Sequence, residues 1–355
     1  MHHLRKLLLS TLLFSGLLPM TGFGQIGGYS TYDFLTLTSS ARVAGMGGDF
    51  LAIRDNDMTL TLTNPSLISP DMHNNLAFNF VNYFKDINYG YFQYSRTFEK
   101  AGSFVGTFQF VDYGSFIRSD ETGATYGEFS ASEYALNIGW GRQLSPHFSI
   151  GANGKLIYSQ LDTYHSFGLA VDVAGTYVSK EDLFTASLIT KNIGIQLVPY
   201  YGSNREPLPL ELQAGMSVRF RHIPLRFSLL YNHIEKWDLL YTDPTNPNNA
   251  TDPITGETKQ QSGVSKFADN LMRHIVLGGE VTFAKVFSIR LGYNYERRQE
   301  LKIYNHAGLS GFSLGVGLHI KMFSVSYTRA TYMGGAINPN YITFTCNLQE
   351  FTKKK

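Results

Sequence analysis

The chain has 355 residues, 30 basic and 28 acidic, and only 16% are charged against ~25% in a typical soluble domain. This balance argues against a nucleic-acid-binding protein, which would show a basic stripe. The single cysteine, Cys346, excludes an internal disulfide framework and a cysteine-based zinc site. With 34 glycines and 14% aromatic residues, the composition favours a β-rich protein with a large surface that does not face water.

The first 24 residues have the pattern of a secretory signal peptide. Arg5 and Lys6 precede an apolar run over 7–18, which is far shorter than the ~20 residues of a spanning helix. Gly22 and Gly24 supply the small residues of a cleavage site before Gln25. No later stretch is long and apolar enough for a transmembrane helix, so a mature chain that enters a membrane must do so as a closed barrel.

Residues 25–75 are predicted to form a plug rather than a strand of the barrel wall. They contain a short helical stretch over 40–46, then glycines, then short apolar runs that end at an Asn-Pro pair. The GMGG sequence at 45–48 lacks the Gly-Lys-Ser/Thr of a phosphate loop, so we predict a tight turn there. A segment of this length fits inside a wide barrel or across its periplasmic mouth. The residues expected to shape the plug are Arg42, Gly45, Gly47, Gly48, Asn64 and Pro65.

Fourteen strand-like segments follow, and most have the ~9–11 residues of a tilted membrane strand, or slightly more. They are 76–84, 87–98, 103–112, 131–143, 147–159, 166–178, 183–192, 208–221, 224–234, 271–284, 286–297, 311–321, 323–332 and 340–348.

The connections between these segments alternate between short and long from the second segment onward. Tight turns at 99–102, 144–146 and 180–182 are interleaved with long links such as 113–130 and 235–270. Outer-membrane barrels have short periplasmic turns and long surface loops, and an even strand count places both termini in the periplasm.

Alternation along the segments assigns one face to lipid. In GFSLGVGLHI (311–320), Leu314, Val316 and Leu318 share a face, whereas Gly315 and Gly317 lie on the other. A soluble sandwich would also alternate, but phenylalanines and tyrosines gather beside the short turns, where a periplasmic aromatic girdle would lie. We therefore predict an all-β fold: a 14-stranded antiparallel transmembrane outer-membrane β-barrel over 76–351, with an N-terminal plug and a short tail over 352–355.

The link at 235–270 is the longest in the chain, and links beyond ~12–15 residues are usually functional or disordered. Strand parity places it on the cell surface. Its aromatic and apolar start is the candidate partner-binding site, with Trp237, Leu240 and Tyr241 as the contact residues, since tryptophan and tyrosine are favoured anchors at interfaces. The alternative is a disordered surface loop.

Several long runs resemble the PorV/PorQ family of the type IX secretion system, which is related to the fourteen-stranded long-chain fatty-acid transporter barrels. The entry segment SARVAGMGG (40–48) and NPS (64–66) match the family. The more specific similarity, to its PorQ branch, rests on MHNNLAFNFVNYFKDINYGYFQYSRTF (72–98), SASEYALNIGWGR (130–142), HIEKWDLLY (233–241), LMRHIVLGGE (271–280) and RLGYNYERRQELKI (290–303).

The resemblance implies an outer-membrane protein that serves protein export and the surface attachment of cargo. The implied partners are a PorZ-like surface protein, anchored by this barrel, and the PorU and PorV members of the attachment complex, besides outer-membrane lipid. No nucleic-acid partner, cofactor, metal site or catalytic set is expected, so we predict a protein that is not an enzyme. His274 and Glu280 share the inward face of one predicted strand, where lumen polarity explains them better than acid–base chemistry.

A rival function is the transport of small hydrophobic molecules, as in the more distant relatives. It needs an apolar pocket in the lumen. The inward residues that can be assigned are mostly Gly, Ser, Asn, Arg and Glu, which argues mildly against it.

Overall fold

The computed structural model describes residues 30–38, 40–240, 262–301, 308–332 and 338–352. The predicted signal peptide (1–24) and Tyr241 lie outside these residues.

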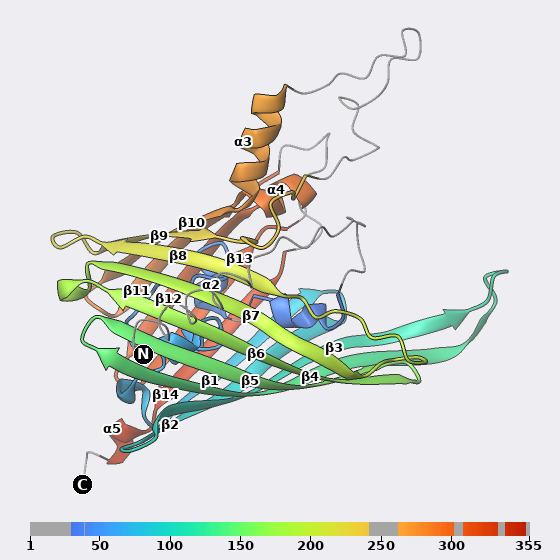
Figure 1. The fold of residues 1–355 in the computed structure, drawn as a ribbon, viewed down its shortest axis with the longest axis horizontal. Coiled ribbons are helices and arrows are strands. Elements are labelled where there is room, and N and C mark those ends of the chain that lie inside the picture. The colour runs from blue at the N-terminus through green and yellow to red at the C-terminus, as the bar shows by residue number, and fades with distance from the viewer. Residues whose placement is uncertain (1–29, 39, 241–261, 302–307, 333–337, 353–355) are drawn as a thin grey trace, which may run out of the picture.

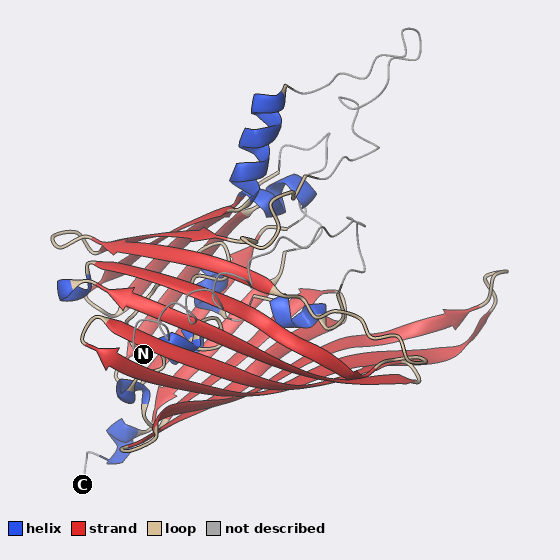
Figure 2. Ribbon diagram, in the orientation of Figure 1, coloured by secondary structure: helices blue, strands red, loops and turns tan. Residues whose placement is uncertain are grey.

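Fourteen antiparallel strands form a closed barrel in which each strand pairs with the next along the chain and β1 pairs with β14 (Figures 1 and 2). The strands are β1 (Asn75–Phe84), β2 (Ile87–Phe98), β3 (Gly102–Ser119), β4 (Thr125–Ser145), β5 (Phe148–Leu161), β6 (Tyr164–Val178), β7 (Phe184–Val198), β8 (Glu211–Arg219), β9 (Leu225–Tyr231), β10 (Ile275–Phe283), β11 (Phe287–Asn294), β12 (Phe312–Ile320), β13 (Phe323–Ala330) and β14 (Asn340–Asn347). The predicted fold class is confirmed. In the part of the chain that the structure describes, no helix is long and apolar enough to cross a membrane.

Each predicted segment coincides with a strand, and the larger differences lie at the long-loop end. Residues 295–297, predicted as strand, belong to a helix, and residues 193–198, predicted as a link, belong to β7. The link predicted over 113–130 is largely a continuation of β3 and β4, which stay paired as far as Ser119 and Thr125. The prediction that a strand begins at 271 is wrong, because residues 271–273 form the end of a helix, α3 (Gly263–Arg273). Arg273 there bonds Asp269 one turn earlier and the Leu239 carbonyl, which holds the chain in the helix.

The outward face of the barrel is apolar, as the alternation predicts. Along β12, Leu314 is 57% exposed and Val316 is 39% exposed. The neighbouring Ser313, whose side chain points to the opposite face, is only 2% exposed. Gly317 faces inward: a Cβ there would lie 2.8 Å from the guanidinium of Arg290. The apolar face of GFSLGVGLHI therefore points away from the lumen.

The first strand begins and the last strand ends at the short-turn end of the barrel, where Asn75 lies opposite Asn347. The opposite, long-loop end carries the extended β3–β4 hairpin together with α3 and α4 (Tyr295–Leu301) (Figure 1). A short helical turn, η5 (Lys180–Asp182), connects β6 to β7, and the helix α5 (Gln349–Thr352) follows β14.

Residues 30–38 and 40–74, here called the hatch, pack against the inward face of the wall (Figure 1). They form α2 (Ala41–Gly45), which contacts β11 to β14, and η3 (Pro65–Leu67), which contacts β4 to β6. Shorter turns are η1 (Asp33–Thr36), η2 (Met58–Leu60) and η4 (Pro70–Met72).

An apolar core joins the hatch to the wall. Met46 and Phe50 of the hatch cluster with Ile189, Leu230 and Val276 of the strands, and each is at most 1% exposed. Burying one such side chain contributes ~1.5–3 kcal/mol relative to leaving it in water. This packing makes the hatch and the barrel wall one folded unit.

Candidate functional site

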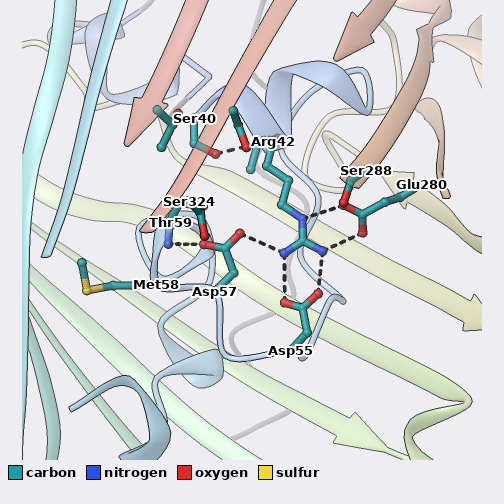
Figure 3. Close-up of polar contacts among 12 residues, drawn as sticks. Ser40, Arg42, Asp55, Asp57, Met58, Thr59, Glu280, Ser288 and Ser324 are labelled. Atoms are coloured by element: carbon teal, nitrogen blue, oxygen red, sulfur yellow. Dashed lines mark hydrogen bonds and ion pairs between the residues drawn. The ribbon is translucent and has the colours of Figure 1, made fainter. Parts of the chain in front are cut away.

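Arg42, on α2 of the hatch, is the centre of a buried ionic cluster (Figure 3). Its Nε and Nη2 donate to the two carboxylate oxygens of Glu280 on β10, at 3.0 and 2.6 Å. Its Nη1 and Nη2 donate to both oxygens of Asp55, at 3.0 and 2.5 Å, and Nη1 also reaches Asp57 at 2.9 Å. The side chains of Arg42 and Glu280 are only 9% and 5% exposed, whereas those of Asp55 (30%) and Asp57 (23%) keep part of their contact with solvent. Bonds between two charged groups of this kind are short and strong.

Two arginines of the wall extend this cluster. Arg226 on β9 lies 2.8 Å from Asp55, and Arg290 on β11 donates to Glu280 at 2.8 Å. Three guanidinium groups thus face three carboxylates, so the cluster is neutral as a whole. Since Arg42 and Asp55 come from the hatch and Glu280 and Arg290 from the wall, the cluster clamps the hatch to β9, β10 and β11.

A second contact lies on the other side of the lumen, where Asn64 begins η3. Its side-chain amide donates to the Leu51 carbonyl at 2.7 Å and to Thr176 of β6 at 3.1 Å, while its Oδ1 accepts from the Ser66 amide at 3.0 Å. Asn64 is fully buried. Pro65 follows as the first residue of the turn, where its missing N–H leaves no donor unsatisfied.

Glycines let the hatch backbone approach the wall. A Cβ on Gly292 of β11 would lie 2.0 Å from the Gly47 nitrogen, and one on Gly45 would lie 2.8 Å from Thr328 Oγ1. Gly47 and Gly48 have φ of 105° and 118°, which non-glycine residues rarely adopt. The tight turn predicted at GMGG is therefore present and pressed against β11.

A cavity of about 470 Å³ borders the ionic cluster and opens at the short-turn end of the barrel. Residues of the turns and strand ends border it, including Lys285, Met322 and Asn347, and its remaining lining is mainly hydroxyl, amide and charged groups. A smaller pocket of about 10 Å³ lies between η1 and strands β2 and β3. It is lined by Phe34, Leu37, Thr38, Tyr89, Gly90, Tyr91, Gln109, Phe110 and Val111.

At the long-loop end, His233 is surrounded by three carboxylates. Its ring nitrogens lie 3.1 Å from Glu235, 3.7 Å from Glu211 and 3.9 Å from Glu296. Burial works against the charged ring, but the carboxylates outweigh it and raise the pKa of His233 to about 9. Burial also raises the pKa of Glu296 to about 7, against the opposing effect of His233.

Two of the three predicted partner-binding residues can be placed. Trp237 is 48% exposed and Leu240 is 37% exposed, and both lie at the long-loop end as predicted. Trp237 stacks on His274 at 5.4 Å between ring centroids and also contacts Phe267 of α3 at 5.5 Å. Their contact with a partner stays a prediction.

Glu280 and His274, which the sequence places on one face, contact different groups of residues. Glu280 belongs to the Arg42 cluster, whereas His274 caps α3 and contacts the carbonyls of Asn232 and Trp237. Among the described residues, no group of His, Cys, Asp and Glu could hold a metal ion. Sequence reasoning singled out Arg42 but missed Asp55, because an acidic residue after a glycine-rich turn has no pattern that distinguishes it from a surface residue.

The fold defines a class, the closed antiparallel β-barrels of the outer-membrane type, here with an N-terminal segment packed against the inward face of the wall. No family model matches the chain, and no curated protein matches it. The solved structures supply the similarity. Two deletion mutants of TodX, described as a monoaromatic hydrocarbon channel, superpose with TM-scores of 0.52 and 0.51 at 10% and 11% identity.

These matches cover 89% and 88% of this chain and 100% and 98% of the TodX chains. The toluene transporter TodX of Pseudomonas putida itself matches at a TM-score of 0.49 and 10% identity, over 87% of this chain and 96% of that one. At such low identity the likeness shows the fold alone. The chain therefore shares the barrel fold of the TodX structures.

Proposed function

We propose that this chain is a non-enzymatic outer-membrane component of the type IX secretion system that anchors a PorZ-like surface protein. The observation that carries the proposal is the hatch, which occupies the barrel and is tied to the wall through Arg42 and Asn64. A barrel that holds such a segment against its inner wall can display long loops at one end without serving as a wide pore. The specific assignment to this system rests on the sequence resemblance to the PorV/PorQ family.

A second candidate is the transport of small hydrophobic molecules, and the likeness in fold to TodX favours it over the first. The lumen offers this candidate less support. The 470 Å³ cavity is bordered by the charges of Arg42, Asp55, Asp57 and Glu280, which an apolar solute would have to desolvate. The pocket beside Phe34 has a volume of about 10 Å³, which is about enough for one water molecule.

Deleting the gene in its native bacterium separates the two candidates. For the anchor, we expect the PorZ-like protein and the exported cargo to appear in the medium instead of on the cells, and a plasmid copy to restore their attachment. Uptake of toluene or of a long-chain fatty acid should be unchanged. Normal attachment with reduced uptake would reject the anchor and support the transporter.

Conductance gives an independent check on the filled lumen. The intact protein in planar bilayers should show little conductance, because the hatch is held by buried contacts. Large and stable channels would contradict both candidates and indicate a general porin.

A further inference from the structure

Helix α3 is strongly amphipathic. Val264, Phe267 and Leu271 project from one side of it, spaced by three and four residues, whereas the polar residues project from the other side. The polar set is Lys266, Asp269, Asn270 and Arg273. Ser262 caps the helix by accepting a hydrogen bond from the Ser265 amide at 3.2 Å.

The two sides are reversed relative to a helix on a soluble protein. Asn270 is 3% exposed: its side chain accepts from the Leu239 amide at 2.9 Å and donates to the Trp237 carbonyl at 2.6 Å. Arg273 is also buried, and its guanidinium reaches the Leu239 carbonyl. The apolar side is open instead, with Val264 80% and Phe267 58% exposed.

The protein therefore already bonds the polar side chains of Asn270 and Arg273, whereas Val264 and Phe267 stay largely exposed, Phe267 with the ring of Trp237 as a neighbour. Tyr295 of α4 adds a further contact to this polar side, since its hydroxyl donates to Asp269 at 2.6 Å. In water, such an arrangement would expose apolar surface without compensation.

The position of α3 relates this open side to the membrane. In Figure 1 the helix adjoins the wall where β9 ends and β10 begins, and it projects away from the barrel, across the direction in which the barrel is elongated. A run of stacked rings connects the helix to the wall. Tyr231, which alternates with the inward Leu230, stacks on His274 at 5.0 Å, His274 on Trp237 at 5.4 Å, and Trp237 contacts Phe267 at 5.5 Å.

We propose that α3 lies on the outer leaflet of the outer membrane and inserts Val264, Phe267 and Leu271 at the boundary between headgroups and acyl chains, with Trp237 as an interfacial anchor. Amphipathic helices bind membranes in this orientation, and aromatic rings are enriched at that depth. The continuity of the ring stack with the outward Tyr231 favours lipid over a protein partner. This contact would hold for an anchor and for a transporter alike.

Site-directed spin labelling tests the proposal on the full chain. Cys346 is the only cysteine, so Cys346→Ala provides a background for single cysteines at Val264, Phe267 and, as a matched control on the polar edge of the same helix, Lys266. The labelled proteins are placed in nanodiscs of phosphatidylcholine and phosphatidylglycerol. Heat-modifiable gel mobility verifies that each variant forms a barrel.

We expect oxygen, which partitions into lipid, to relax the labels at Val264 and Phe267 more than a water-soluble nickel chelate does, and the reverse at Lys266. If the nickel chelate relaxes the labels more than oxygen does at all three positions, the proposal is overturned and the surface is one for a protein partner. A second readout uses the two tryptophans. In Trp140→Phe, bromine atoms near the top of the acyl chains should quench Trp237, and quenching by aqueous iodide alone would contradict the lipid contact.

Discussion

The Arg42 cluster predicts how firmly the hatch is held. In the Arg42→Met variant, a side chain of similar length and no charge replaces the guanidinium. The change removes all five hydrogen bonds to Asp55, Asp57 and Glu280 and leaves these carboxylates in a site where the Glu280 side chain is 5% exposed.

Removing one partner of a buried ion pair usually destabilises a protein by ~3–5 kcal/mol, because the remaining charge is buried without compensation. Here Arg290 stays bonded to Glu280 and Arg226 to Asp55, so we expect the lower end, about 3 kcal/mol. That free energy corresponds to an increase of about 150-fold in the opening equilibrium of the hatch. Arg42→Lys should give an intermediate loss, since lysine keeps the charge but not the bidentate geometry.

Hydrogen exchange of the α2 amides measures this opening. The Ala44 amide, which donates to the Ser40 carbonyl at 2.9 Å, should exchange faster in Arg42→Met by a factor of about 150 if exchange follows hatch opening. Arg221→Met is the matched control: its pair with Glu181 is 58% exposed on both sides, so it should change stability by less than ~1 kcal/mol. Equal protection of α2 in Arg42→Met and the unmodified protein would refute the clamp and assign the hatch to apolar packing alone.

Three further changes test the wall and the rim. Gly292→Ala should displace the hatch backbone and accelerate hatch proteolysis, whereas Gly279→Ala, with nothing within 4 Å of its added Cβ, should not. Val316→Arg should impair heat-modifiable folding by ~2–4 kcal/mol of lipid-face penalty, while Ser324→Arg, which opens into the polar cavity, should be better tolerated. The folded pKa of His233, about 9, lies above its ordinary 6.5, so its stabilisation is complete below pH 6.5 and is lost as pH rises through 9. Limited proteolysis of the long-loop end should therefore increase between pH 7 and pH 10, and His233→Gln should show no such rise.

The barrel could be predicted because its signals are local. Alternation such as that of Leu314 and Gly315 fixes which face a strand turns outward, and short turns fix where each strand ends. Gly317 shows the limit of this reasoning. The sequence predicts its inward direction, but not that Arg290 fills the space beside it, so Gly317→Ser is a poorer lumen control than Ser324→Arg.

The contacts of the hatch could not be predicted, because they join residues far apart in the chain. Arg42 and Glu280 are separated by 238 positions, and no spacing rule connects an arginine after a helix cap with a glutamate in a late strand. The helix α3 was missed for a different reason. Its apolar residues continue into Ile275 and Leu277 of β10, so a period of two and a period of 3.6 overlap at the junction.

The clamp also links the structure to the choice between the two functions. A solute that crosses the barrel through the lumen meets the hatch, and moving the hatch away from the wall separates Arg42 from Glu280 of β10. A small hydrophobic molecule offers no charge to replace these contacts, so it cannot compensate the separation. If the barrel transports such molecules through its lumen, loosening the clamp by Arg42→Met should raise uptake. If it anchors a surface protein through its long loops, the same variant should retain that protein on the cell as well as the unmodified barrel does.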